Sequence, residues 1–156
     1  MARRLRDEIQ QQRPFESLEQ EAVLNVLRTA DVLLQRIAAV LKPFKLSHSQ
    51  YNVLRILRGA GPEGLACREI SERMISRDPD ITRLLDRLEA RGLLTRTRDQ
   101  KDRRVIMAHI TPEGLRLLEA LDQPIAEVDR QPLEPLGEQR LRTLIRLLEV
   151  ARERGR

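Results

Sequence analysis

The sequence predicts a mainly α-helical fold with a small β-hairpin. Three observations support this prediction. Leucines recur at helical spacing along most of the 156 residues. A helix, a sharp break and a second helix span residues 68–91. Two short strand-like runs then flank a basic turn. A helix, turn, helix and hairpin in this order form a winged helix-turn-helix, here with leucine-rich helices at the N- and C-terminal sides.

The charge and aromatic content favour duplex nucleic acid as a partner. The chain carries 26 Arg, 3 Lys and a formal net charge of +5. The planar arginine side chain suits phosphates and guanine edges, although a GC-rich genome also favours arginine codons. Aromatic residues are only 2% of the chain, whereas proteins that bind single strands usually stack bases on aromatic side chains. We therefore expect double-stranded DNA to be the partner.

The sequence also indicates the cellular compartment. A single cysteine, Cys67, rules out an intramolecular disulfide and fits a reducing environment. The charged stretch from Arg3 to Glu8 lacks the apolar core of a signal peptide. No apolar run approaches the roughly 18 residues that a membrane-spanning helix needs. We expect a cytoplasmic protein without a membrane partner.

The N-terminal part, residues 1–45, is predicted to be a loose polar arm followed by a dimerisation helix. The helix is expected from Glu16 to Lys42 and ends before Pro43. Its apolar positions cover a broad arc rather than one narrow stripe. A helix of this kind has to be covered on several sides, and a second copy of the chain would supply such cover.

Residues 46–111 form the predicted DNA-binding region, which begins with a capping-box pattern from Ser47 to Gln50. The helix that follows is expected to stop at residues 59–62, Gly-Ala-Gly-Pro. Residues 64–66 read as a short extended piece, and Arg68 to Met74 as the first helix of the helix-turn-helix.

The second helix of the motif is predicted from Asp80 to Arg91, with Asp78 as its cap and Pro79 in its first turn. Its apolar side chains form one stripe, and Gly92 ends it. The strands of the hairpin are expected at Leu93 to Thr97 and Val105 to Ile110.

The C-terminal part, residues 112–156, is predicted to contain dimerisation helices packed with the other two parts in one compact domain. The first of these helices opens at the sequence Thr-Pro-Glu of residues 111–113. Pro124 is expected to kink or split it. A last leucine-rich helix is expected from Gly137 to Arg152.

The exposed face of the second helix supplies the first candidate DNA contacts. Thr82 and Arg83 lie near its start, where Arg83 is placed to bind guanine through two hydrogen bonds. Arg87, one turn further on, is expected to meet phosphate, and Arg77 in the preceding break completes the set. Asp80 either accepts a hydrogen bond from cytosine or stabilises the helix start. A solvated surface role for Arg83 remains the alternative.

The hairpin tip supplies the second set. Residues 91–104 hold six basic and two acidic side chains, a net charge of +4. A narrow minor groove concentrates negative potential and attracts arginine. The candidate DNA-binding residues of the wing are Arg98, Lys101, Asp102, Arg103 and Arg104. Asp102 is expected to brace an arginine side chain through a forked ion pair. The alternative is a solvated turn that binds nothing.

Other chemistry is weakly supported. Cys67 stands at a helix start, where a thiolate is favoured, but no second cysteine exists to resolve an oxidised form. A small residue that fills the helix start is the favoured interpretation. His48 and His109 are far apart, and no cluster has metal-ligand spacing. No phosphate loop or nucleophile elbow is present. We expect no cofactor, no metal and no enzymatic activity.

Three stretches together carry a specific resemblance. They read TRLLDRLEARGLL at residues 82–94, DRR at 102–104 and ITPEG at 110–114. In this combination they resemble the MarR family of bacterial transcription regulators, and the resemblance extends from about residue 16 to nearly the end of the chain.

The resemblance implies a homodimer whose first and last helices interlock and whose two winged helices bind a near-palindromic operator. It implies that Asp102 braces the wing and that Arg104 enters the minor groove. Many members are repressors released by small aromatic acids. A phenolic acid bound near Phe44, Tyr51 and Arg55 would be the counterpart here, although these residues also read as ordinary core and rim residues.

The sequence therefore predicts a sequence-specific, double-stranded DNA-binding transcriptional regulator, a ligand-responsive repressor that acts as a homodimer. The alternative is a winged-helix module that binds proteins and not DNA. Such a module predicts an acidic or apolar reading face. The arginines of the second helix and the net charge of the wing favour DNA.

Overall fold

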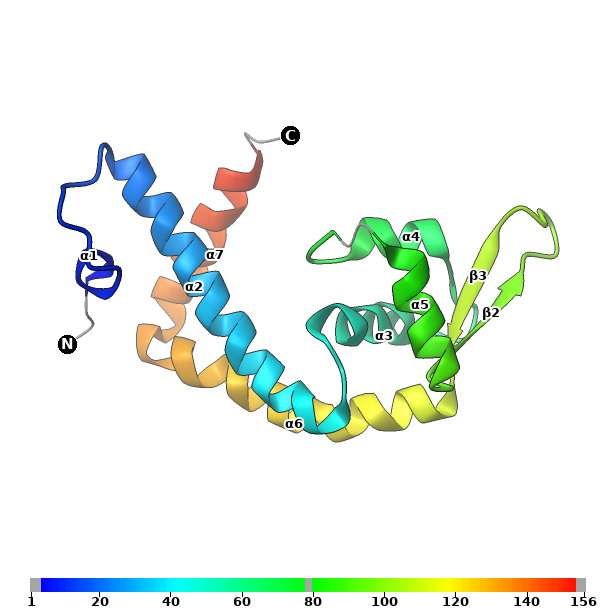
Figure 1. Ribbon diagram of the computed structural model, residues 1–156. Helices are drawn as coiled ribbons and strands as arrows, with labels where there is room; N and C mark the ends of the chain where they lie inside the picture. The colour runs from blue at the N-terminus through cyan, green and yellow to red at the C-terminus, as the bar shows by residue number, and fades with distance from the viewer. Residues whose placement is uncertain (1–3, 78–79, 154–156) are drawn as a thin grey trace. The chain divides into compact units, whose positions relative to one another are not determined.

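The structure is a computed structural model that describes residues 4–77 and 80–153 (Figure 1). The chain divides into two compact units, one up to Arg36 and one from Ile37 onward. The first unit holds α1 (Leu5–Glu8) and most of α2 (Leu18–Leu41). The predicted division of the chain after residues 45 and 111 falls inside the second unit.

The N-terminal arm is more ordered than the sequence predicts. Leu5 of α1 is buried, and the Arg6 guanidinium donates hydrogen bonds to the carbonyl oxygens of Gln11 and Gln12 at 3.2 and 3.0 Å. These bonds fold the polar stretch back on itself after α1. The helix predicted from Glu16 to Lys42 is present as α2.

The second unit contains the remaining elements in the predicted order. They are the 3₁₀ turn η1 (Lys42–Phe44), α3 (His48–Ala60), β1 (Leu65–Ala66), α4 (Cys67–Arg73), α5 (Ile81–Ala90), β2 (Leu94–Arg98), β3 (Ile106–Ile110), α6 (Pro112–Leu133), the 3₁₀ turn η2 (Glu134–Leu136) and α7 (Gly137–Glu153). The mainly α fold with a small β wing is therefore confirmed.

Local capping fixes where several of these helices begin. The Ser47 hydroxyl accepts from the Gln50 backbone N–H, and the Gln50 side chain accepts from the Ser47 N–H, so the predicted capping box is present. Thr111 caps α6 by accepting from the Gly114 N–H, with Pro112 in the first turn. The Thr111 hydroxyl also donates to the Gly92 carbonyl at 2.6 Å, which ties the start of α6 to the end of α5.

The wing is part of a three-stranded antiparallel sheet with the order β1-β3-β2. β2 and β3 form the predicted hairpin, in which Leu94 lies opposite Ile110 and Arg98 opposite Ile106. The short extended piece predicted at residues 64–66 adds the third strand, because Leu65 pairs with Ala108. β2 is therefore an edge strand, and within residues 4–77 and 80–153 no strand lies beside its outer side.

α6 is not split at its centre, which was one of the two outcomes that the sequence predicted for Pro124. The helix runs from Pro112 to Leu133 without a break, although Pro124 lies inside it. A proline removes one backbone hydrogen bond from a helix interior. Leu118 and Leu121 before it and Ile125 after it are all buried in the core, so packing on both sides of Pro124 holds the helix together.

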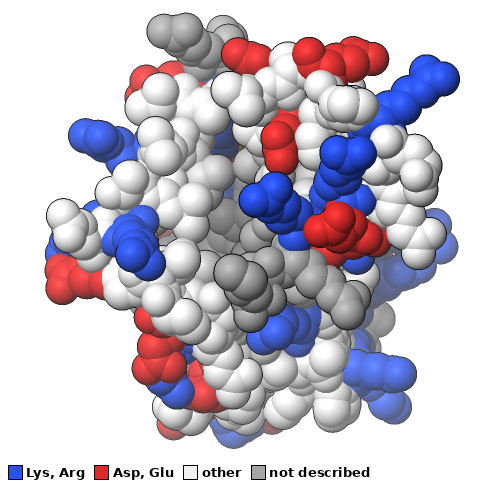
Figure 2. All heavy atoms as spheres, turned by 90° about the vertical axis from the view of Figure 1, so that its left-hand side faces the viewer, with Lys and Arg blue, Asp and Glu red and all other residues white. Residues whose placement is uncertain are grey.

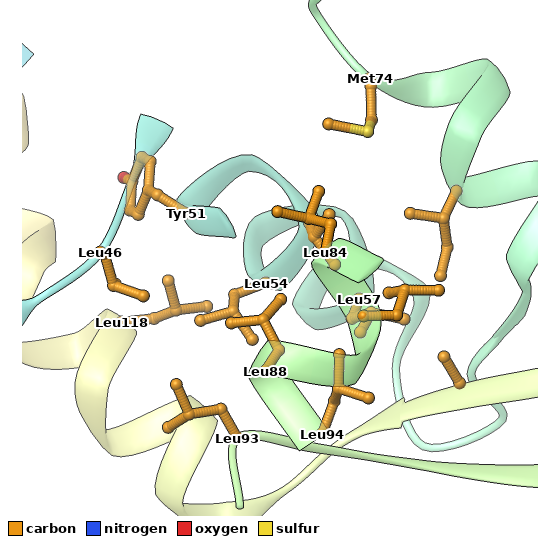
Figure 3. Close-up of a cluster of buried hydrophobic side chains, with 14 of the residues drawn as sticks. Leu46, Tyr51, Leu54, Leu57, Met74, Leu84, Leu88, Leu93, Leu94 and Leu118 are labelled. Atoms are coloured by element: carbon orange, nitrogen blue, oxygen red, sulfur yellow. The ribbon is translucent and has the colours of Figure 1, made fainter. Parts of the chain in front are cut away.

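The core of the second unit joins the helices to the sheet. Figure 3 shows buried leucines of α3, α5, α6 and the start of β2 pointing toward one another. Leu54, Leu57, Leu88 and Leu118 are completely buried, and each contributes roughly 1.5–3 kcal/mol by leaving water. This core fixes the rotation of α5 about its own axis. Among the described helices, none combines the length and the low polarity required to cross a bilayer.

Gly114 offers a test of the junction between α6 and the wing. A Cβ atom at this position would lie 2.4 Å from the Leu93 backbone oxygen. We expect Gly114→Ala to lower the free energy of unfolding by about 1–3 kcal/mol, as overpacking does. Urea denaturation at a fixed protein concentration measures this change.

Gly59→Ala is the matched control, because a Cβ atom there meets nothing within 4 Å inside α3. Alanine favours a helix by up to about 1 kcal/mol over glycine, so this variant should be as stable as the parent protein or more stable. Equal stability of the two variants would contradict the close approach at Gly114.

Candidate nucleic-acid interface

α5 is positioned by a narrow apolar stripe. Leu84, Leu85 and Leu88 are buried, whereas Thr82, Arg83 and Arg87 lie on the exposed side of the helix. Within the described residues, no hydrogen bond or ion pair holds the side chain of Arg83 or Arg87. Both guanidinium groups are therefore free to meet a ligand.

The start of α5 is fixed by Asp80. Its side chain caps the helix by accepting from the Arg83 backbone N–H at 3.0 Å. The cap predicted at Asp78 and the first-turn Pro79 lie outside the described residues. The helix-stabilising interpretation of Asp80 is thus supported by geometry. Arg77 is exposed in the turn before α5.

The same turn is anchored to α3, because the Asn52 side chain accepts a hydrogen bond from the Ile75 N–H at 2.9 Å. α4 is joined in turn to the sheet by Glu69, whose carboxylate accepts from the Ala66 N–H. These two bonds hold the segment before α5 against the rest of the unit.

The tip of the wing is shaped by two aspartates. Asp99 accepts hydrogen bonds from the backbone N–H groups of Lys101 and Asp102, and Asp102 accepts from the N–H of Arg104 at 3.0 Å. Asp102 does brace the tip, but through a backbone amide. Among the described residues, Asp102 does not form the forked ion pair with an arginine side chain that the sequence predicted, since its carboxylate reaches the nearer amide two residues on.

The tip presents three unengaged cations. Arg98 is exposed and donates to the Arg103 carbonyl at 3.0 Å, which stabilises the turn. Lys101, Arg103 and Arg104 are exposed, and no bond within residues 4–77 and 80–153 engages their side chains. The wing therefore carries its available charge at its end.

Two other basic residues of the segment are bound to the protein itself. Arg91 donates to the carbonyl oxygens of Phe44 and Lys45 at 3.0 and 2.7 Å, beside the end of η1. Arg96 pairs with the carboxylates of Asp86 and Glu89 on α5. The net charge of +4 counted along the sequence thus overstates the charge that is free at the wing.

The pKa shifts of Arg96 and Glu89 agree with the view that Arg96 is bound to the protein itself. The hydrogen bond from Arg96 holds the pKa of Glu89 below its usual value, and the two carboxylates raise the pKa of Arg96.

On the side of the molecule shown in Figure 2, acidic and basic side chains lie in small mixed groups among uncharged ones. That face does not present a surface of one sign.

The residues predicted to bind an effector lie in the second unit. Phe44 is half-buried and packs against the core, and Tyr51 is buried. Arg55 is exposed, with its guanidinium carbon 5.9 Å from the centre of the Tyr51 ring. Burial raises the pKa of the Tyr51 hydroxyl, so the ring stays neutral at pH 7. Phe44 and Tyr51 therefore have packing roles, and Arg55 is the accessible member.

An ion pair beside this group was not predicted. Arg58 of α3 forms a bidentate pair with Asp122 of α6, with both bonds at 2.9 Å. The Arg58 guanidinium holds the pKa of the Asp122 carboxyl below its usual value. The two residues are 64 positions apart in the chain, so no local sequence pattern could predict the contact.

Cys67 and His109 both contact other parts of the protein. Burial raises the pKa of the half-buried Cys67 thiol, which disfavours a reactive thiolate. The His109 ring lies 3.3 Å from both the Thr97 hydroxyl and the Pro62 carbonyl oxygen, between the wing and the loop before β1. The part of the chain that the structure describes holds no group of three or more potential metal ligands.

Sequence reasoning missed the roles of Arg91 and Arg96, which it counted with the wing cations. A signal for Arg96 was present, since Asp86 and Glu89 are three residues apart on one helix and share a face. Arg96 lies in β2, the strand that follows this helix. Arg91 binds carbonyl groups 46 and 47 positions away, for which the sequence offers no signal.

An exposed arginine-bearing helix, followed by a hairpin with cations at its tip, defines a winged helix-turn-helix protein of the DNA-binding class. Comparison with known proteins agrees. The MarR family model matches residues 46–106, which include α3, the helix-turn-helix, β2 and the tip of the wing.

Individual proteins extend the similarity over most of the chain. The HTH-type transcriptional regulator PecS of Dickeya dadantii (strain 3937) is 31% identical over 130 residues, 82% of this chain and 78% of PecS. The crystal structure of a MarR transcription factor from Planctomyces limnophilus is 43% identical, with a TM-score of 0.67 over 88% of this chain and 99% of that one.

A third similar protein is CouR from Rhodococcus jostii RHA1, solved bound to p-coumaroyl-CoA. It is 26% identical, with a TM-score of 0.73 over 86% of this chain and 94% of CouR. The chain belongs to the MarR family of transcriptional regulators.

The Arg58–Asp122 pair predicts a pH-dependent contribution to stability. Because the pKa of Asp122 is lowered in the folded state, the contribution is full above the unfolded pKa of about 3.9 and is lost as the pH falls through the folded value. We expect Arg58→Gln to lower the free energy of unfolding at pH 7 by less than about 1 kcal/mol, since the pair is partly exposed. The difference should shrink below about pH 4.

Chemical denaturation at several pH values measures this difference. The control is Arg142→Gln, which removes an exposed pair with Glu138 on α7. Its effect should be smaller at every pH, because an exposed pair within one helix contributes less. A loss in Arg58→Gln that stayed constant down to pH 3 would assign it to packing instead of charge.

Proposed function

We propose that this protein is a repressor that binds a near-palindromic operator in double-stranded DNA as a homodimer and releases it when a small aromatic acid binds. Its activity is binding and not catalysis. It acts in the compartment that holds the chromosome, which we take to be the cytoplasm.

One observation carries the DNA-binding part of the proposal. The unengaged cations of the head lie on the exposed side of α5 and at the end of the wing, the two places that this fold offers to adjacent grooves. α5 lies in the major groove, where Arg83 binds guanine and Thr82 contacts a neighbouring base. Arg87 and Arg77 meet phosphates, and Asp80 acts beside them as the cap of the reading helix.

The wing reaches the adjacent minor groove. Arg104 enters the groove, where the negative potential is strongest, while Lys101 and Arg103 contact the phosphates on its rims. Arg98 and Asp102 support this contact from within the turn, since both hold backbone groups of residues 103 and 104.

The homodimer is supported by the exposed apolar side chains of the outer helices. The exposed large apolar residues of α2 are Leu18, Val23, Val26, Leu27, Val32 and Leu34, and those of α7 are Leu144, Ile145, Leu147 and Val150. Exposed apolar side chains in this number mark each of the two helices, taken by itself, as an interaction surface. A second copy of the chain satisfies both helices at once and pairs two reading heads with two half-sites.

The test is a mobility-shift assay on DNA that flanks the coding region, with random duplex as the reference. We expect two chains per duplex and an affinity that falls steeply with salt, because bound arginines release counterions. Arg104→Ala should weaken specific binding by about tenfold or more, equivalent to about 1.4 kcal/mol.

Arg152→Ala is the matched control, since this exposed arginine lies at the end of α7 and outside the head. It should bind as the parent protein does. Equal effects of the two substitutions would remove the wing from the interface. Binding that stays flat between low and moderate salt would contradict the DNA-binding proposal and favour a winged-helix module for protein partners.

The effector part rests on Arg55, an exposed cation whose guanidinium lies over the Tyr51 ring. Phe44, which the sequence also singled out, is half-buried. A phenolic acid suits this position, because its carboxylate would pair with the exposed Arg55 guanidinium. The p-coumaroyl-CoA bound by CouR shares the phenolic ring of such an acid, but carries it as a thioester without a free carboxylate.

We test this site with p-coumarate and salicylate added to the protein–DNA complex. At least one of them should release the duplex, and Arg55→Ala should require about tenfold more of that compound, the loss expected for one charged contact. Arg140→Ala on α7 is the control. Release by the same concentration in Arg55→Ala and the parent protein would exclude Arg55 from the site.

A further inference from the structure

Arg96 lies on the free edge of the wing sheet. β2 is an edge strand, and its backbone groups on the outer side have no strand to bind. The Arg96 N–H donates to the Glu89 carboxylate of α5 at 2.8 Å. A side chain of the reading helix therefore satisfies the exposed edge of the wing, which would otherwise be open to pairing with another strand.

The side chain of Arg96 makes the same connection. Its Nη2 atom lies 3.0 Å from Glu89 Oε1 and 2.5 Å from Asp86 Oδ1. Only 20% of the Arg96 side chain is exposed. Asp86 and Glu89 are three residues apart and share one face of α5. One residue of the wing thus contacts the reading helix at three points.

The bonds of Arg96 with Asp86 and Glu89 form a joint between α5 and the wing, and the wing tip lies some distance beyond it. The wing tip begins at Lys101, five residues beyond Arg96, and the chain between them spans at most roughly 16 Å, the length of an extended segment. A tilt of the hairpin by about 10° at Arg96 would therefore move the tip by up to about 3 Å, which is the length of a hydrogen bond. Contacts made by the tip therefore depend on the angle between the hairpin and α5, which the bonds of Arg96 fix.

We propose that Arg96 is a positioning residue that fixes the wing against the reading helix, and that it does not contact DNA itself. This inference rests on the proposed function. Through Arg96, the hairpin tip and the exposed face of α5 keep the spacing of adjacent grooves. Asp86 and Glu89 serve DNA binding by holding Arg96, although each carries a negative charge near the phosphates.

The sign of a charge change tests the proposal. Glu89→Gln removes an anion from the interface, so simple electrostatics predicts tighter DNA binding. Positioning predicts the reverse, since the amide of glutamine holds Arg96 more weakly than a carboxylate does. We expect Glu89→Gln to bind the operator fragment about tenfold more weakly than the parent protein. Glu119→Gln, which removes an exposed carboxylate of α6, is the control and should not weaken binding.

Coupling to the wing tip gives the second measurement. If Arg96 positions the wing, Arg104→Ala should cost less affinity in the Glu89→Gln background than in the parent protein, because the tip is already displaced. Arg96→Gln keeps a hydrogen-bond donor at this position and should behave as Glu89→Gln does. Should Glu89→Gln fail to fold, as circular dichroism would show, Arg96→Gln replaces it in both measurements.

A DNA-free measurement separates this inference from the proposed function. The Arg96 amide hydrogen should exchange slowly in the parent protein and faster in Glu89→Gln, as followed by NMR of the full chain. If the parent protein binds no duplex, the proposed function fails while the joint itself is still measured. Equal or tighter operator binding by Glu89→Gln, or an undiminished effect of Arg104→Ala in its background, would overturn the positioning role.

Discussion

The burial of one leucine stripe is the constraint on which the interface depends. Leu84, Leu85 and Leu88 occupy a narrow arc of α5 and are buried against α3 and the sheet. Successive residues of a helix are about 100° apart. If the apolar stripe were shifted by one position along the sequence, the helix would pack after a rotation of about 100° and its arginines would turn toward the core. The packing of three leucines therefore decides that Thr82, Arg83 and Arg87 face outward. Side chains that never meet a ligand set the direction of those that do.

The same core brings the reading helix, the wing and α6 to one junction. Gly92 adopts the left-handed conformation after α5, and Leu93 and Leu94 are buried as the chain enters β2. Thr111 then bonds to both Gly92 and Leu93 before α6 begins. Because three elements meet within a few residues, a shift of α6 acts on the reading helix and on the wing root together.

The parts of this architecture that follow local rules could be predicted from the sequence. The stripe of α5, the capping box at Ser47 and the hairpin all depend on neighbours within a few positions. Most of what the sequence did not predict depends on contacts across the fold. Pro124 does not split α6 because residues distant in sequence pack on both sides of it. The partners of Arg58 and Arg91 lie more than 40 positions away. Asp102 is a local exception, since its carboxylate accepts from the Arg104 amide two residues on instead of forming a fork with an arginine side chain.

Charge counted along a sequence is thus a poor measure of charge at an interface. Of the six basic residues between positions 91 and 104, Arg91, Arg96 and Arg98 are bonded to the protein, while Lys101, Arg103 and Arg104 remain available. The salt dependence of binding reports only the cations that neutralise phosphates. The acidic residues of the head carry the complementary meaning. Asp80 caps the reading helix, Asp99 and Asp102 shape the tip, and Asp86 and Glu89 hold the root of the wing. A surface built to bind a polyanion uses its own anions to place its cations.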